Sequence, residues 1–158
     1  MNLNAQTQTT NYFLLFAGVC TAIAAVAHIG CIIFGAPWYR FFGAGEEMAT
    51  MAEQGLIYPH IVTAVIATIL LLWSCYAFSG AKRIRQLPLM KIALCVISAI
   101  FLIRGIGFVF IMPAIPDNSM TFWWVSSSIC LVIGGAYALG TKKHAHKSNH
   151  FKSQHFRC

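Results

Sequence analysis

The chain of 158 residues is 58% hydrophobic and only 9% charged, with a mean hydropathy of +0.69. Soluble domains carry about 25% charged residues, so this composition excludes an ordinary soluble domain and indicates a single membrane-embedded one. The formal charge of +7 does not indicate nucleic-acid binding, because the basic residues lie at the ends of apolar runs and in a tail.

Four apolar runs follow one another along the chain, at residues 12–35, 56–78, 88–112 and 120–139. Each approaches or exceeds the roughly 20 residues that a helix needs to cross the hydrocarbon of a bilayer. The runs lack the alternation of a lipid-facing barrel, and a helix satisfies its own backbone hydrogen bonds. The sequence therefore predicts an all-α integral membrane protein in which residues 12–140 form a four-transmembrane-helix bundle.

The beginning of the chain and its cysteines carry no processing or redox signature. Residues 1–11 contain no Lys or Arg, and the run after them is longer than the apolar part of a secretory signal, so we expect a retained span. Five of the six cysteines lie inside apolar runs and none forms a C-x-x-C pair. Neither a disulfide framework nor a cysteine metal ribbon is expected.

The connection of residues 38–55 has a helical pattern of its own. Between Gly43 and Gly55, small and apolar residues recur on one side, while Glu46, Glu47 and Glu53 lie on the other. The pattern predicts a short amphipathic helix on the outer surface, ending at Gly55. Such a helix caps a bundle in the simplest interpretation and covers a binding site in the alternative one.

The charges are segregated by connection. All four acidic residues lie in the connections 36–55 and 113–119, whereas nine of the eleven Lys/Arg lie in the tail or between residues 82 and 91, around the connection of the second and third runs. Basic connections stay in the cytoplasm during insertion, so we expect both termini to be cytoplasmic. Small size, short loops and the lack of a eukaryotic sorting signal favour a bacterial inner membrane.

The tail, residues 141–158, holds four histidines among five basic residues. A His-rich tract can bind metal. The basic residues favour a different interpretation, a disordered cytoplasmic anchor on the anionic lipids of the inner leaflet.

Arg104 is the one fully charged residue deep inside an apolar run, since Lys91 lies near the start of the third run. Charges at membrane depth are costly and usually paired or functional. Helix rise places Arg104 roughly 12 Å from the outer end of the third span. Its side chain either snorkels outward, or forms a structural ion pair with Glu46, Glu47 or Asp117, or binds an anionic or carbonyl-bearing ligand such as a lipid headgroup or a quinone.

His28 and His60 lie toward the same outer side as Arg104, on helix faces shared with small or polar residues. Each is expected to be a hydrogen-bonded core histidine or, with Arg104 and a carboxylate, part of a proton relay or acid–base pair. A b-type haem needs both imidazoles at one depth, and His28 lies deeper than His60. A transition metal held by His28, His60 and Glu47 is chemically reasonable, although no tight motif supports it. We therefore expect no cofactor, with haem or quinone as the alternatives.

Together these residues suggest a small, non-enzymatic inner-membrane protein that supports the envelope barrier or membrane energetics. It would bind a lipid, a quinone or a protein partner at the outward polar layer, with Arg104 as anion clamp. His28 and His60 would line the layer, and Glu46 and Glu47 would supply counter-charges. The alternatives are a membrane enzyme acting on a lipid or isoprenoid substrate and a proton-coupled transporter. Small residues in the first and last spans also allow a homo-oligomer or a membrane-protein partner.

Overall fold

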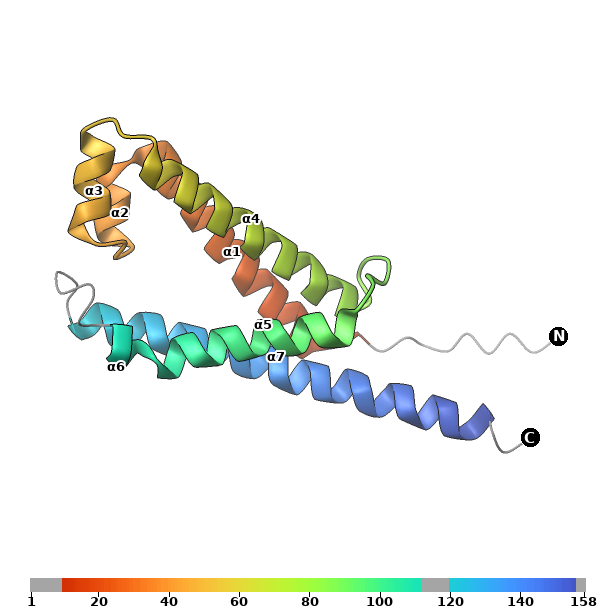
Figure 1. Cartoon of the computed structure of the whole chain (residues 1–158). Coiled ribbons are helices and arrows are strands. Elements are labelled where there is room, and N and C mark those ends of the chain that lie inside the picture. Colours follow the sequence, from red (N-terminus) through yellow and green to blue (C-terminus); the bar gives the residue numbers. More distant parts are fainter. Residues whose placement is uncertain (1–9, 112–119, 156–158) are drawn as a thin grey trace.

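The computed structural model of the chain describes residues 10–111 and 120–155 (Figure 1). Within these ranges the predicted all-helical class is confirmed, because they contain helices and no strands. The elements in chain order are α1 (Tyr12–Phe34), α2 (Ala36–Phe41), α3 (Glu46–Glu53), α4 (Tyr58–Gly80), α5 (Met90–Ile106), α6 (Phe108–Ile111) and α7 (Met120–His155).

Three described helices are long and apolar enough to cross a membrane, namely α1, α4 and the Met120–Lys143 part of α7. Large apolar side chains are exposed on them, for example Ile23 and Val65, as lipid-facing helices require. The predicted span at residues 88–112 is instead divided, because α5 has 17 residues and ends before Gly107. The N–H of Gly107 bonds to the carbonyl of Ile103 at the end of α5, and the chain restarts as α6.

The last helix is longer than the sequence suggested. We expected the span to end at residue 139 and the tail to be disordered, but the backbone is helical to His155. Gly140 does not end the helix, because its backbone packs closely on Leu14 and the following Thr141 hydroxyl donates to the Tyr137 carbonyl at 2.7 Å. No proline follows to interrupt the helix.

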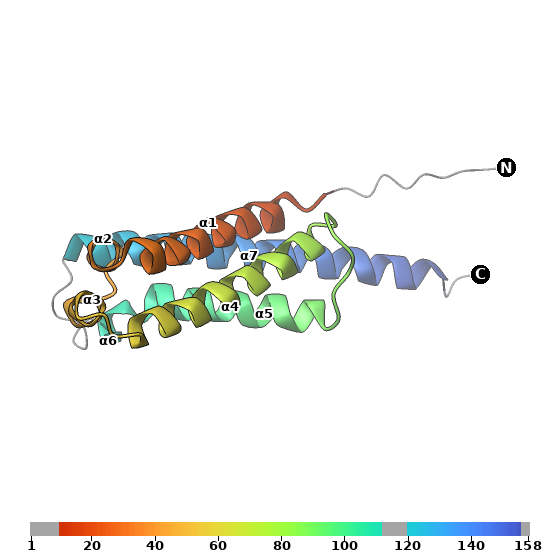
Figure 2. The same ribbon diagram turned by 90° about the horizontal axis from the view of Figure 1, so that it is seen from above.

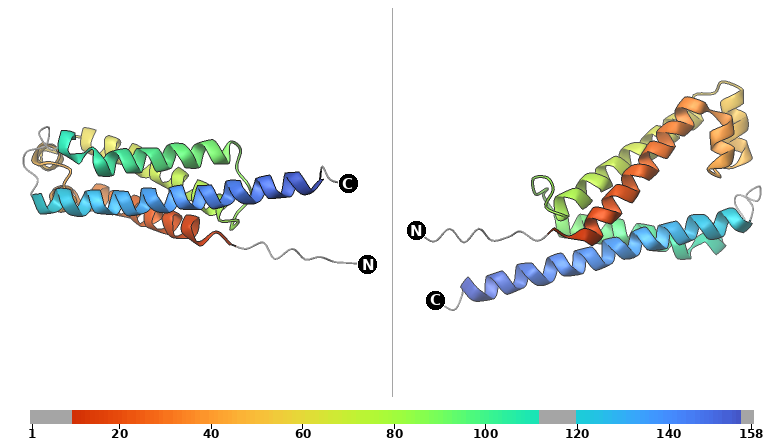
Figure 3. Two further views of the ribbon diagram at one scale, coloured as in Figure 1. Left: turned by 90° about the horizontal axis from the view of Figure 1, so that it is seen from below. Right: turned by 180° about the vertical axis from the view of Figure 1, so that it is seen from behind.

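The long helices form two antiparallel pairs, with α1 packed on α4 and α5 packed on α7. The pairs meet at the end that carries the start of α1 and diverge toward α2 and α3, as Figures 1 and 3 show. Viewed from above, all four helices run nearly side by side (Figure 2). We call the end with α2 and α3 the cap end, and the end with Lys82, Lys91 and Lys142 the basic end.

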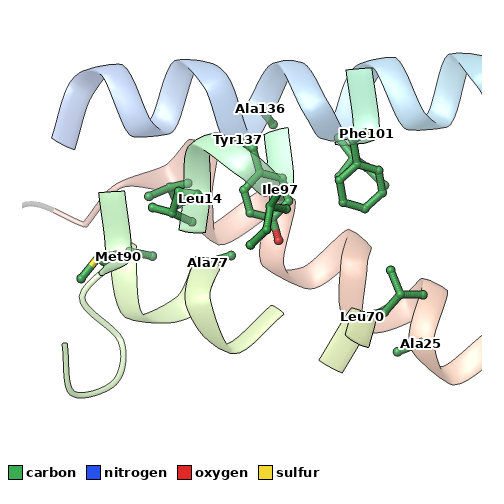
Figure 4. Close-up of a cluster of buried hydrophobic side chains, with 13 residues drawn as sticks. Leu14, Ala25, Leu70, Ala77, Met90, Ile97, Phe101, Ala136 and Tyr137 are labelled. Atoms are coloured by element: carbon green, nitrogen blue, oxygen red, sulfur yellow. The ribbon is translucent and has the colours of Figure 1, made fainter. Parts of the chain in front are cut away.

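The core lies where the pairs meet. Leu14 is fully buried, and it contacts the backbone of Gly80 in α4 and of Gly140 in α7. Ile97, Phe101 and Tyr137 from the other pair complete this cluster (Figure 4). A single apolar cluster therefore joins the four long helices near the basic end.

Hydrogen bonds reinforce these contacts inside the apolar region. The Tyr137 hydroxyl donates to the carbonyl of Trp73 at 3.1 Å and lies 3.2 Å from the hydroxyl of Thr21, so it links α7 to α4 and α1. Ser74 donates to the carbonyl of Gly18, and Ser98 to that of Gly134, both at 2.9 Å. Such bonds between helices are the usual polar contribution to membrane-helix association.

Helices α2 and α3 form a cap, residues 36–53, at the ends of α1 and α4 (Figure 1). The predicted amphipathic helix is confirmed as α3, in which Ala49 is buried and the three glutamates are exposed. Helix α2 was not predicted. It begins with Pro37 in its first turn, and its Trp38 ring packs directly on Gly30 of α1.

Candidate binding site

Arg104 lies on α5 and points along α7 toward the cap end. The bond between Ser98 and Gly134 fixes the register of these antiparallel helices. Six residues further along α5, Arg104 is therefore level with the serines at 126–128 of α7. Its guanidinium carbon lies 5.4 Å from the ring centroid of Trp123, within the range of a cation–π contact. The side chain thus extends from the level of the serines to the indole.

Three buried polar atoms in this region lack a partner. Among the described residues, the buried side-chain atoms without a hydrogen bond are Nη1 of Arg104, Nε1 of Trp123 and Oγ of Ser127. Trp123 is 1% exposed and Ser127 3% exposed, so water does not reach them easily. Each buried unsatisfied group costs about 1–3 kcal/mol. All three groups lie in one region, on facing turns of α5 and α7, so their cost to stability is concentrated there.

The chemistry of the three atoms is uniform, because each has a hydrogen to donate. Arginine and tryptophan nitrogens are donors only, and a serine hydroxyl donates one hydrogen. Trp123 and Ser127 are four residues apart on one helix face, about 6 Å along the axis. We call Arg104, Trp123 and Ser127 the donor cluster. It suits a ligand with closely spaced acceptor oxygens, such as a phosphate, a carboxylate or a quinone carbonyl.

Gly105, next to Arg104 on α5, leaves room for Leu131 of α7 to approach. A Cβ at Gly105 would lie 2.7 Å from the Leu131 side chain. The glycine therefore serves the close approach of α5 and α7, as small residues commonly do in membrane proteins.

Glu46 is not the counter-charge of Arg104. Its carboxylate binds Arg40 of α2, whose Nε donates to both oxygens at 2.9 and 3.0 Å. Arg40 Nη1 also donates to Glu53 at 2.6 Å, so one guanidinium holds the two ends of α3. Glu47 is exposed on α3, and Asp117 lies outside the described residues. A pairing of Arg104 with Glu46, one of the alternatives drawn from the sequence, is not formed, because Arg40 already occupies that carboxylate.

These ion pairs shift the titration of the cap. Hydrogen bonding to Glu46 and then to Glu53 raises the pKa of Arg40 above its ordinary value. The bond from Arg40 lowers the pKa of Glu46 and that of Glu53 below the ordinary 4.5. Since the three groups are largely exposed, solvent screens the pairs, and their main effect is on the arrangement of α2 against α3.

His28 is bound to its own helix. Its Nδ1 lies 2.7 Å from the carbonyl oxygen of Ala24. Because a carbonyl can only accept, Nδ1 carries the proton, and Nε2 is the acceptor in the neutral ring. Thr21 and Cys31, which share its helix face, are buried as expected.

His60 lies at the start of α4 and contacts the cap, rather than belonging to the layer of Arg104. Its Nδ1 lies 3.3 Å from the hydroxyl of Tyr39, which is 1% exposed in α2. Ser74 is level with Gly18, which puts His60 about one turn nearer the cap end than His28. The two imidazoles have different neighbours at different depths. This arrangement favours neither a haem held between them nor a shared acid–base pair.

A metal ion held by His28, His60 and Glu47 was a possibility that no sequence motif supported. In the part of the chain that the structure describes, no three His, Cys, Asp or Glu side chains gather in a way that could hold a metal ion. Helix packing instead gives each histidine a hydrogen-bond partner of its own.

The predicted polar layer is thus divided between two places. His28, His60, Glu46 and Glu47 lie on α1, α4 and the cap, whereas Arg104 lies on α5. Sequence reasoning did not assign Arg40, Tyr39 or Trp123 to a binding site. The spacing of Trp123 and Ser127 on one helix face could have indicated Trp123, and Arg40 is the only basic residue near the glutamates of α3 in the sequence.

Comparison of the chain with protein families, with curated proteins and with solved structures gave no match. The site is therefore interpreted from its own geometry.

Proposed function

We propose that the chain is a small membrane-embedded binding protein, which receives the oxygen-rich head of a lipid-soluble molecule at the donor cluster. The observation that carries this proposal is the collection of three buried donors without acceptors on facing turns of α5 and α7. An acceptor at this place would regain the hydrogen bonds that folding leaves unmade. A lipid phosphate and a quinone carbonyl share the required chemistry.

The proposed topology follows the charge pattern. We propose four spans, with α5 and α6 together forming the third, in a bacterial inner membrane with both termini cytoplasmic. The cap end then faces outward, because the acidic residues belong to the outer connections and the basic residues flank the inner ends. A role in the envelope barrier or in membrane energetics follows from a lipid or quinone held at the outer level.

The cap supports this proposal by its contact with α7. Gly43 has a φ of +66°, and a Cβ at this position would overlap the ring of Phe122. Phe122 is adjacent to Trp123 in the donor cluster, so the cap meets α7 one residue from the proposed site. We propose that the cap covers the donor cluster from outside and limits the entry of water.

The experiment compares ligand retention by the full chain and by Arg104→Leu, purified in mild detergent and measured by native mass spectrometry. The probes are decylubiquinone, phosphatidylglycerol and phosphatidylcholine, each added separately. Ser98→Ala is the matched control. It removes a buried hydroxyl from the same helix pair, but that hydroxyl already donates to the carbonyl of Gly134. Helix content by circular dichroism verifies that each variant folds.

We expect Arg104→Leu to weaken retention of one probe by about 10- to 100-fold, since a hydrogen bond to a charged group is worth about 1.5–3 kcal/mol. Retention of decylubiquinone that Arg104→Leu loses would identify a quinone site at the donor cluster, and retention of phosphatidylglycerol that Arg104→Leu loses would identify a lipid headgroup site there. Ser98→Ala should retain the same probe as the wild type. Equal retention by folded Arg104→Leu would overturn the proposal.

A further inference from the structure

A second feature lies away from the donor cluster, on the surface of the bundle between α1 and α7. It is a groove of about 500 Å³. Phe13 and Phe16 line it from α1, and Leu131, Val132, Gly135 and Leu139 line it from α7. Its volume falls within the range of about 300–1,000 Å³ that is usual for small-molecule sites.

The dimensions of the groove suit one half of a bilayer. From Leu131 to Leu139 the axis of α7 rises about 12 Å. Half of the hydrocarbon core is about 15 Å thick, so the groove extends through about one leaflet. A Cβ added to Gly135 would meet no atom within 4 Å, so the floor of the groove is open. Such a shape accommodates a single acyl chain.

A basic group marks the basic end of the groove. Nζ of Lys143 lies 4.3 Å from the ring centroid of Phe13, which is itself a lining residue. The neighbouring Lys142 is exposed. All four acidic residues of the chain belong to the connections 36–55 and 113–119, near the opposite end of α7. Among the described residues, the ion pairs are those of Arg40 with Glu46 and Glu53 in the cap, which leaves the charge of these lysines available to an anion from outside.

We propose that this groove binds one acyl chain of an anionic glycerophospholipid whose phosphate lies at Lys142 and Lys143. The apolar lining and the adjacent positive charge together match a molecule with a long tail and a negative head. In the proposed orientation the lipid belongs to the cytoplasmic leaflet. The site is independent of the donor cluster, because no residue of that cluster lines the groove.

The test measures binding of phosphatidylglycerol and of phosphatidylcholine to the full chain in mild detergent by native mass spectrometry. Gly135→Leu fills the groove from its open floor. Ala138→Leu is the matched control, because it adds the same side chain at an exposed position of α7 that does not line the groove. Val132→Trp fills the groove from its rim and serves if Gly135→Leu fails to fold. The double variant Lys142→Gln/Lys143→Gln tests the headgroup contact.

We expect the wild type to bind phosphatidylglycerol more tightly than phosphatidylcholine. Each lysine removed should lower the ratio of the two affinities about fivefold, because a basic group near an anionic membrane contributes about 1 kcal/mol. Gly135→Leu and Val132→Trp should bind less of both lipids, while Ala138→Leu and Arg104→Leu bind as the wild type does at this site. Equal binding of the two lipids by the wild type would overturn the proposal. So would full binding by a folded groove-filling variant.

Discussion

The α1/α4 pair and the α5/α7 pair use buried polar residues in different ways. In the first pair, Ser74 has a backbone partner on the facing helix, and His28 has one on its own helix. In the second pair, Ser98 is bonded in the same manner at the middle of α5. Toward the cap end, however, Arg104, Trp123 and Ser127 each keep a buried atom without a partner.

This difference separates structural polar groups from candidate binding groups. A buried polar side chain whose bonds are complete holds two helices together, and its loss weakens the fold. A buried donor without an acceptor lowers the stability of the fold and is available to a ligand. The two kinds of residue cannot be distinguished by composition, since both helix pairs have serines inside apolar runs.

The largest effect should come from breaking the junction that joins the two pairs. Leu14→Ala removes a fully buried side chain that contacts α4 and α7, and it leaves a cavity there. We expect a loss of about 2–5 kcal/mol in the free energy of unfolding, measured by denaturation with sodium dodecyl sulfate in mixed micelles. Leu72→Ala, at an exposed position of α4 that does not line the groove, is the control and should cost much less. Equal losses of unfolding free energy in the two variants would contradict the assignment of Leu14 to the junction.

A smaller effect should follow from removing one link between the pairs. Tyr137→Phe keeps the ring but removes the hydroxyl that contacts Thr21 and the carbonyl of Trp73. Hydrogen bonds between membrane helices contribute about 0.6 kcal/mol on average and at most about 1.7 kcal/mol. We therefore expect the free energy of unfolding to fall by about 0.6–1.7 kcal/mol. The same denaturation assay measures it. An unchanged stability would show that this bond does not help to join the pairs.

The smallest effect concerns the cap. The pKa values of Glu46 and Glu53 are lowered by Arg40, so their contribution is complete above the ordinary value of 4.5 and is lost as the pH falls through the lowered values. We expect hydrogen exchange in α3 to become faster in acid, relative to the intrinsic rates, while α4 is unaffected. Arg40→Gln should show fast exchange in α3 at neutral pH and little further change on acidification. A wild-type pattern in that variant would exclude the Arg40 ion pairs as the cause.

Hydropathy and helical spacing predicted most of the helices. The apolar runs lie at α1, α4, α5 and α7, and the alternation of glutamates with small residues predicted α3. The break at Gly107 and the continuation of α7 past Gly140 were missed. A glycine in a helix either ends it or allows close packing, and only the neighbouring helix decides between the two.

The candidate site was less accessible from sequence. Depth along each run identified Arg104 as unusual, but depth does not reveal which helices pair. It grouped Arg104 with His28, His60 and Glu46, whereas α5 pairs with α7 and the cap holds Glu46 through Arg40. The missing information was the pairing of the helices and the rotation of each about its axis.

The most direct test of the central claim is the unfolding free energy of Ser127→Ala compared with that of Ser74→Ala, each measured without added ligand. Both variants remove one buried serine hydroxyl, but only Ser74 donates to a partner helix. The account predicts that Ser74→Ala loses about 0.6 kcal/mol, and that Ser127→Ala keeps or slightly gains stability. A loss in Ser127→Ala as large as that in Ser74→Ala would mean that the hydroxyl of Ser127 is a structural group and would contradict the account.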